Sequence, residues 1–337
     1  MGLNPTQSKE SAPPAPPPIL NWLAGVVALG AGVLTFVGEV TILTGQTIRW
    51  IARGGTDWRD LVTQMALIGA DSVWIVLVIT AATGAVFALY TTSLALKIGF
   101  TQFVGGTMSY GFLNELGPVL GGVAFASRSG AAIAAEIGSM VVTEQVDALR
   151  SMAISPVRYL VVPRVLAAII MLPLLTVIAD CAGLYGSFIF AVAKGVPAQT
   201  FWESVRKYTL TNDLLNGLLK SVVFGLLVGL VACQQGLRTK GGATGVGKAT
   251  TSSVVLCVVL IFVADFFMAQ ALTARDTSRN ASAAPVRRMI AARDQDSIAC
   301  VSMGETVAWQ RQEREPRTAK DRVDMRPCTA ALSPGLV

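Results

Sequence analysis

Residues 118–142, with the sequence PVLGGVAFASRSGAAIAAEIGSMVV, decide the fold. This apolar stretch exceeds the roughly 20 residues that a helix needs to cross the hydrocarbon core of a bilayer, so it predicts a transmembrane helix. Small residues recur in it at every fourth position, as Gly122, Ala126, Gly130, Ala134 and Gly138. Such a ridge lets helix backbones approach closely in lipid. It predicts tight helix packing, either within one subunit or at a subunit interface or movable seam.

Four further apolar segments are long enough to cross a membrane, at residues 72–96, 159–193, 214–232 and 250–272. A preceding segment, residues 19–43, is moderately apolar and Gly-rich, and it contains Glu39. By length this segment can span the bilayer, and by composition it can lie along the interface, so hydropathy leaves both arrangements open. The sequence predicts an all-α integral membrane protein with five transmembrane helices.

The composition excludes several classes of protein. The chain has 337 residues, 53% hydrophobic and 14% charged, which leaves too little polar surface for a soluble domain. It contains no histidine, so imidazole general bases and imidazole metal ligands are absent. The five cysteines form no CxxC pair. We predict no catalytic site, no metal, no cofactor and no nucleic-acid partner.

The charge is unevenly distributed and divides the chain into three parts. Residues 1–272 carry 29 charged side chains, whereas the 65 residues 273–337 carry 19. We predict a disordered Pro-rich lead-in over 1–18, a membrane domain over 19–272 and a disordered charged tail over 273–337.

Lysine and arginine residues predict the orientation of the spans, because cytoplasmic connections are enriched in them. One side of the predicted bundle carries nine, which are Arg49, Arg53, Arg59, Arg150, Arg158, Arg164, Arg238, Lys240 and Lys248. The other side carries four, which are Lys97, Lys194, Arg206 and Lys207. The side with nine is therefore predicted to face the cytoplasm.

Six ionisable residues lie within or beside the apolar segments, namely Glu115, Arg128, Glu136, Asp180, Lys220 and Asp265. Each is costly in lipid and should face the bundle interior, a cavity or another charge. Arg128 and Glu136 lie about 12 Å apart along one helix and cannot pair within it, whereas Lys220 and Asp265 can pair between helices. Structural ion pairing and a direct role in transport both remain open for these charges.

The cytoplasmic connection 143–156 reads TEQVDALRSMAISP and predicts a short helix that opens with acidic residues and stops at Pro156. Val146, Leu149 and Ala153 fall on one stripe. Such a helix can dock into a groove on a soluble partner, or it can lie on lipid, where Glu144 and Asp147 would meet anionic head groups unfavourably. Residues 242–249, GATGVGKA, nearly match a phosphate-binding loop, but Ala249 replaces the required hydroxyl and no strand precedes them.

Several ordered motifs together resemble the MlaE/YrbE family, the permease subunits of ABC lipid transporters that work with MCE-domain proteins. The matching runs are NELGP at 114–118, RSG at 128–130, AAEIGSM at 134–140, TEQVDAL at 143–149 and YLVVPR at 159–164. The resemblance covers about residues 20–272. The charged tail departs from the family, whose members usually end soon after the last span.

The resemblance implies an interfacial N-terminal helix, five transmembrane helices and a dimer of like or unlike permeases. It also implies a cytoplasmic ABC ATPase, a periplasmic MCE-domain protein and a lipid cavity between the two permeases. The family's coupling helix, which docks in the ATPase, corresponds to residues 144–156 and contains Glu144, Gln145, Asp147, Leu149 and Arg150. Arg128, Glu136, Lys220 and Asp265 resemble the family's buried charges.

We therefore predict a non-enzymatic, multi-pass permease of the bacterial inner membrane that moves phospholipid or another hydrophobic lipid, powered by ATP hydrolysis in a partner. The alternative is an ion-coupled secondary transporter that uses the intramembrane charges and needs no ATPase.

Overall fold

The computed structural model describes residues 18–54, 58–209 and 211–275, and within these residues the chain is helical with no strand. The predicted lead-in 1–18 and tail 273–337 lie outside the described residues, except for Pro18 and residues 273–275, which are helical. The chain divides into two units, Met1–Leu272 and Thr273–Val337, and the description that follows concerns the first.

The first half of the unit contains seven α-helices joined by short 3₁₀ and π segments. In order these are α1 (Pro18–Ala52), α2 (Trp58–Gly69), η1 (Ala70–Ser72), α3 (Val73–Ile98), η2 (Thr101–Phe103), α4 (Val104–Gly111), η3 (Phe112–Leu116), α5 (Gly117–Phe125), η4 (Ala126–Gly130), α6 (Ala131–Val142) and α7 (Gln145–Ser151). The second half contains η5 (Val157–Val161), α8 (Val162–Ala193), α9 (Ala198–Tyr208), α10 (Thr211–Leu237) and a last helix, Gly242–Arg275.

Among the described residues, five helices are long and apolar enough to cross a membrane by length and composition, namely Gly30–Ala52, Trp58–Ile98, Val157–Ala193, Thr211–Leu237 and Gly242–Arg275. The predicted span 118–142 lies in a further helical run, 104–142, which the π segments η3 and η4 interrupt. The last helix begins before the predicted position 250, because the GATGVGKA segment is its first turns and not a loop. The fold is that of an all-α integral membrane protein.

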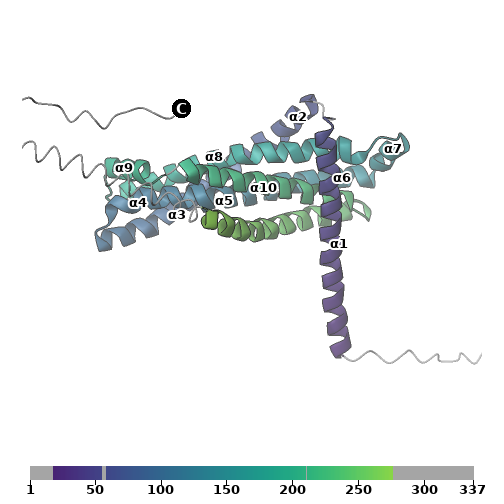
Figure 1. Cartoon of the computed structure of the whole chain (residues 1–337), viewed down its shortest axis with the longest axis horizontal. Coiled ribbons are helices and arrows are strands. Elements are labelled where there is room, and N and C mark those ends of the chain that lie inside the picture. Colours follow the sequence, from purple (N-terminus) through teal and green to yellow (C-terminus); the bar gives the residue numbers. More distant parts are fainter. Residues whose placement is uncertain (1–17, 55–57, 210, 276–337) are drawn as a thin grey trace, which may run out of the picture. The chain divides into compact units, whose positions relative to one another are not determined.

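Helix α1 lies across the other long helices near the end that carries α6 and α7 (Figure 1). Its Glu39 accepts a hydrogen bond from Gln234 Nε2 at 2.7 Å and lies 3.4 Å from Arg238 NH1, both at the end of α10. Its Trp50 ring lies 5.3 Å from the Arg158 guanidinium carbon on η5. Gly30–Ala52 is also long and apolar enough to cross a membrane, so the two arrangements predicted for residues 19–43 both remain hypotheses.

The core of the bundle depends on small residues where helices cross. Gly84 of α3 packs directly on the backbone of Gly183 in α8, and the Ser187 hydroxyl donates a hydrogen bond to the Gly84 carbonyl at 3.0 Å. Glycines 217, 225 and 229 of α10 similarly face backbone of the η3 and α8 segments. These close approaches leave no room for larger side chains and bring the helices together without a hydrophobic driving force, as packing in lipid requires.

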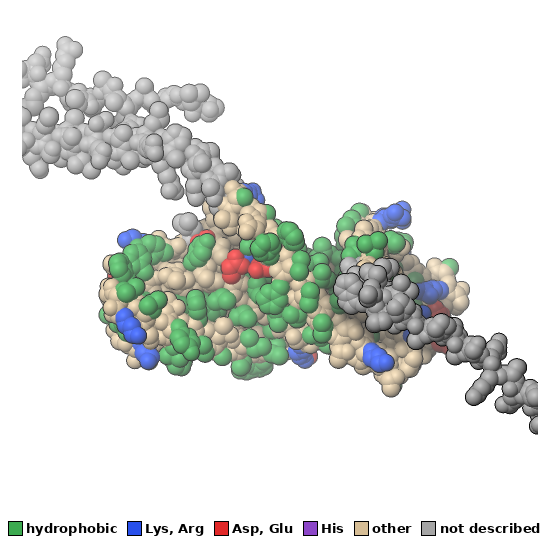
Figure 2. All heavy atoms as spheres, turned by 90° about the horizontal axis from the view of Figure 1, so that it is seen from below, with side chains coloured by type: hydrophobic (Ala, Val, Ile, Leu, Met, Phe, Trp, Pro, Cys, Tyr) green, Lys and Arg blue, Asp and Glu red, His purple; other side chains and the backbone are tan. Residues whose placement is uncertain are grey.

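The outer surface of the bundle is mostly hydrophobic. Figure 2 shows hydrophobic side chains over the middle of one face, basic side chains toward its ends and a small acidic group within the hydrophobic area. Exposed large apolar residues include Leu94, Leu174, Val255 and Phe266. A monomer in water rarely exposes so much apolar surface, whereas a lipid-facing surface is expected to.

Candidate functional site

Helix α7 protrudes from the end of the bundle between α6 and η5 (Figure 1). Backbone turns with positive φ bound it on both sides, at Glu144 (φ 59°) and Ala153 (φ 60°). Glu144 occupies the N-cap position but its side chain makes no capping hydrogen bond. The chain instead turns into the helix through the left-handed conformation of Glu144, and the helix ends at Ser151, before the predicted stop at Pro156.

The charged side chains of α7 point into solvent. Glu144 and Gln145 are exposed, and Asp147 and Arg150 form an exposed ion pair at 3.0 Å. Exposed pairs of this kind contribute at most about 1 kcal/mol to stability. They are consequently available to a partner.

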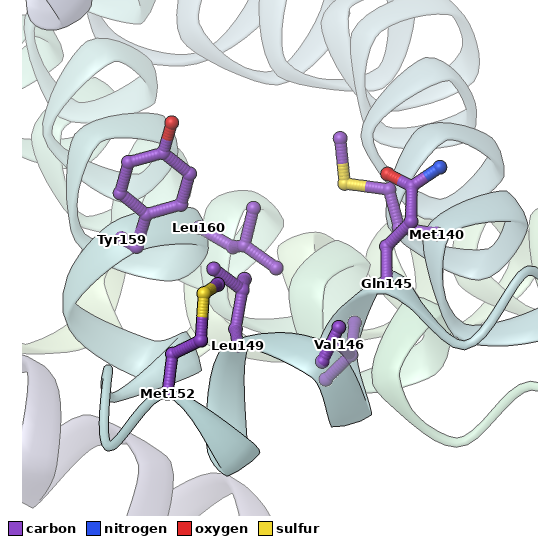
Figure 3. Close-up of a pocket in the computed structure, with 8 residues that line it drawn as sticks. Met140, Gln145, Val146, Leu149, Met152, Tyr159 and Leu160 are labelled. Atoms are coloured by element: carbon purple, nitrogen blue, oxygen red, sulfur yellow. The ribbon is translucent and has the colours of Figure 1, made fainter.

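Apolar residues fix α7 to the bundle and leave a groove beside it. Val146 is buried, and Leu149 lies with Met152 along a pocket of about 190 Å³. Figure 3 shows Tyr159 on one side of this pocket and Met140 with Gln145 on the other. Ala153 is exposed beyond the end of the helix, so the stripe is shorter than the sequence indicated. The groove joins α7 to α6 and η5, the ends of two long helical runs.

A second cluster lies inside the bundle around Lys220, which is 2% exposed. Its Nζ lies 2.7 Å from Glu115 Oε2 and 2.9 Å from Asp265 Oδ1. Lys220 is nine residues from the start of α10 and Asp265 ten from the end of the last helix, about 14–15 Å along each axis. The cluster therefore lies within the apolar length of both helices and away from their ends.

The π segment η3 presents Glu115 to this cluster. π segments within α-helices are rare and frequent at functional sites, because the wider turn redirects side chains. Glu115 is 46% exposed, which gives the cluster an opening at the hydrophobic surface. The sequence indicated a Lys220–Asp265 pair, and the structure adds Glu115 to it.

Two of the three remaining charges pair with residues of neighbouring segments. Arg128, in the π segment η4, lies 3.0 Å from Asp71 of η1. Glu136 lies 2.8 Å from Arg164, whose side chain is 3% exposed. Sequence reasoning missed Asp71 and treated Arg164 only as a loop charge. The position of Arg164 inside the predicted 159–193 span was the available signal.

Asp180 differs from the other charges because its two carboxylate oxygens find no hydrogen-bond partner among the described residues. It is 5% exposed and packs against Gly117 at the end of η3. A methyl group on Gly117 would overlap this carboxylate, so the glycine makes room for it.

The ridge in the 104–142 run faces the interior of the subunit. Gly122 faces Phe224 and Ile261, Gly130 faces Val228, and Gly138 faces Thr239. Ala126 and Ala134 are fully buried. The structure thus places the ridge against α10 and the last helix of the same chain.

Known proteins match the part of the chain that carries these clusters. The family model described as Permease MlaE matches residues 61–271, which include Glu115, α7, Lys220 and Asp265. The chain belongs to the MlaE permease family.

Sequence similarity to individual relatives extends over most of their length. The chain is 39% identical over 227 residues to a probable ABC transporter permease protein of Synechocystis sp., covering 67% of this chain and 86% of the relative. It is 36% identical over 240 residues to a probable ABC transporter permease protein of Rickettsia bellii, covering 69% of this chain and 91% of the relative. It is 34% identical over 231 residues to the chloroplastic protein TRIGALACTOSYLDIACYLGLYCEROL 1 of Arabidopsis thaliana, covering 68% of this chain and 66% of the relative.

Proposed function

We propose that this MlaE permease moves phospholipid or another hydrophobic lipid across or out of the bacterial inner membrane, driven by a separate cytoplasmic ABC ATPase. The observation that carries the proposal is α7, a short helix with exposed charges, anchored by Val146 to the ends of two long helical runs. A force applied to such a helix reaches the bundle directly. Glu144, Gln145, Asp147, Leu149 and Arg150 are the proposed contacts.

The nature of the cargo is supported by the Lys220 cluster and by one relative. The cluster holds buried charge within apolar helices, with Glu115 half-exposed at the hydrophobic surface. Such an arrangement suits a molecule with a polar head and apolar chains. The Arabidopsis relative carries the name of a glycerolipid.

The transporter would also contain further subunits. A second permease, like or unlike, would complete a lipid cavity, and an MCE-domain protein on the far side would receive or supply the lipid. Arg128–Asp71 and Glu136–Arg164 would hold the helices in register during this work. Membership in a family whose relatives are named ABC transporter permeases favours this function over an ion-coupled secondary transporter.

The double substitution Glu144→Lys with Asp147→Lys tests the ATPase contact. We expect the variant to fold and to lose co-purification of the ATPase, because both side chains are exposed and their charge is reversed. Size-exclusion chromatography checks the fold, and quantified pull-down from cells that express the complete complex checks the contact. Glu203→Lys on α9 is the control, since it reverses an exposed charge elsewhere. Undiminished co-purification would refute the assignment, and mass spectrometry of lipids bound to the assembled complex would identify the cargo.

A further inference from the structure

A polar pocket of about 180 Å³ lies between α2, α6 and the η5–α8 junction. Its polar lining comes from one face of α2 and from three residues of the other segments, namely Asp60, Thr63, Gln64, Glu136, Tyr159 and Arg164. Positions 60, 63 and 64 share a face of α2 because they are spaced three and four residues apart, while Leu61 and Ile68 are buried against the bundle. The pocket is separate from the Lys220 cluster.

The pocket lies beside the second half of helix α1, near the end of the bundle that carries α7. The Trp50 ring of α1 lies 5.3 Å from the guanidinium carbon of Arg158, and the next residue, Tyr159, lines the pocket. Arg164 lies seven residues into the helical run that starts at Val157, about 10 Å along the axis. The pocket is therefore close to the end of the bundle that carries the exposed charges of α7, and charged and aromatic side chains at such an end are typical of the head-group level.

The guanidinium of Arg164 supplies an unused donor. Its NH2 lies 2.8 Å from Glu136 Oε1 and its NH1 donates to the Leu160 carbonyl at 3.2 Å. Its Nε has no hydrogen-bond partner among the described residues, although the side chain is 97% buried. A buried donor without an acceptor is costly and is expected to meet one, here a phosphate oxygen.

The pocket also carries an excess of carboxylate. Asp60 and Glu136 line the pocket together with one guanidinium, that of Arg164, and no described cation forms an ion pair with the exposed Asp60. The Thr63 hydroxyl already donates to the Arg59 carbonyl at 2.9 Å, so its oxygen is left to accept. A ligand with an ammonium group beside its phosphate satisfies these acceptors, whereas a purely anionic head group does not.

The surroundings of the pocket favour a lipid as the source of this chemistry. Its volume is too small for a whole lipid, and the neighbouring side chains Val62 and Leu67 of α2 are exposed and apolar, as acyl chains require. The pocket also shares Met140, Tyr159 and Leu160 with the groove beside α7. A movement of α7 that shifts α6 and η5 would therefore also move the lining of the pocket at Met140, Tyr159 and Leu160.

We propose that this pocket binds the head group of a cytoplasmic-leaflet aminophospholipid, with the phosphate at Arg164 and the ammonium at Asp60. The inference deepens the proposed function, on which it rests for the identity of the cargo as lipid. Arg164 and Glu136 hold the pocket together, and Asp60, Thr63 and Gln64 select the head group.

Native mass spectrometry of the full chain tests the proposal. The protein is released from nanodiscs that contain equal amounts of phosphatidylethanolamine, phosphatidylglycerol and phosphatidylcholine. We expect preferential retention of phosphatidylethanolamine, and Asp60→Asn is expected to reduce that preference about tenfold, as the loss of one charge-assisted hydrogen bond predicts. Glu203→Gln removes an exposed carboxylate on α9 and should leave the preference unchanged. Thr63→Val provides a second pocket variant.

Equal retention of the three lipids, or an unchanged preference in both pocket variants, overturns the proposal. Displacement of the lipid by soluble glycerophosphoethanolamine at millimolar concentration would mean that the pocket takes a free head group, and this also overturns it. Co-purification of the ATPase with Asp60→Asn separates the two hypotheses. If Asp60→Asn loses the lipid preference and retains the ATPase, the pocket is supported independently of ATPase coupling. Conversely, the double variant Glu144→Lys with Asp147→Lys is expected to lose the ATPase and to keep the lipid preference.

Discussion

At the scale of single residues, Lys220 is the charge on which the bundle depends most. It is almost fully buried and is paired with Glu115 and Asp265. Lys220→Met would leave two carboxylates without their counter-ion, at a cost of about 3 kcal/mol or more. Glu115→Gln should cost less, because Glu115 is half-exposed and Lys220 keeps Asp265. Thermal unfolding in detergent compares the two variants, and equal midpoints would contradict this ranking.

Gly84 allows a direct test of backbone contact. A methyl group there would overlap the Gly183 carbonyl oxygen, which is backbone and cannot rotate away. Gly84→Ala should therefore destabilise the fold by about 1–3 kcal/mol, as overpacking does. The control is Gly45→Ala on α1, where a methyl group meets nothing within 4 Å. Unfolding midpoints of the two variants measure the difference, and a Gly84 variant as stable as its control would show that α3 and α8 separate freely.

Sequence reasoning at this scale identified which charges matter but not all their partners. The cost of charge in lipid singles out Glu115, Lys220 and Asp265 from hydropathy alone. Pairing depends on how each helix is rotated and shifted against its neighbours, which a single sequence does not specify. Asp71 was missed for this reason, because it lies at the edge of the predicted 72–96 span and pairs with Arg128 across helices.

At the scale of helices, polar and aromatic contacts connect the second half of α1 to the bundle. Glu39 connects it to Gln234 and Arg238, and Trp50 stacks near Arg158. Glu39→Leu should loosen the second half of α1, seen as at least severalfold faster hydrogen exchange over residues 40–52. Thr35→Val is the control, because the exposed Thr35 hydroxyl bonds only within α1. Unchanged exchange in the Glu39 variant would show that the polar contacts do not hold α1 and that its apolar packing, through Phe36 and Leu43, does.

The existence of the long helices followed from hydropathy, whereas their irregularities did not. The predicted 159–193 span is observed almost unchanged as Val157–Ala193. The helical run that contains the predicted 118–142 span begins earlier, at residue 104. Hydropathy did not predict this extension, because the Gly- and Ser-containing segment 104–111 is less apolar than a typical span. The π segments η3 and η4 were not predicted, because they do not change the pattern of apolar residues in the sequence. The short polar helix α9 was missed, since its amphipathic stripe is only three turns long.

At the scale of the whole molecule, the distribution of lysine and arginine predicts which end is cytoplasmic. A single cysteine is placed at Arg150 or at Lys194, in a chain whose native cysteines are replaced. Both positions are exposed, at opposite ends of the α6–α8 region. A membrane-impermeant maleimide applied to intact bacteria should label the Lys194 site and leave the Arg150 site unlabelled until the cells are opened. The reverse pattern would invert the proposed topology and exclude an ATPase at α7.

The helical runs are longer than a bilayer is thick. The Trp58–Ile98 run has 41 residues, or about 60 Å, against about 30 Å of hydrocarbon. The excess means that the bundle projects beyond the hydrocarbon, and the exposed charges of α7 lie on such an end. Arg164 lies about 10 Å from the same end of the bundle.

The π segment η4 gives the 104–142 run a particular sensitivity to insertions and deletions. Residues spaced by four drift about 40° per step around a regular α-helix, yet all five members of the ridge are buried. The wider turn over Ala126–Gly130 takes up part of that drift. Deleting one residue there would rotate the two halves of the helix against each other by about 100°, turning half of the ridge toward lipid without altering a single ridge side chain. Homologous permeases should therefore vary in residue type along this run more readily than in its length.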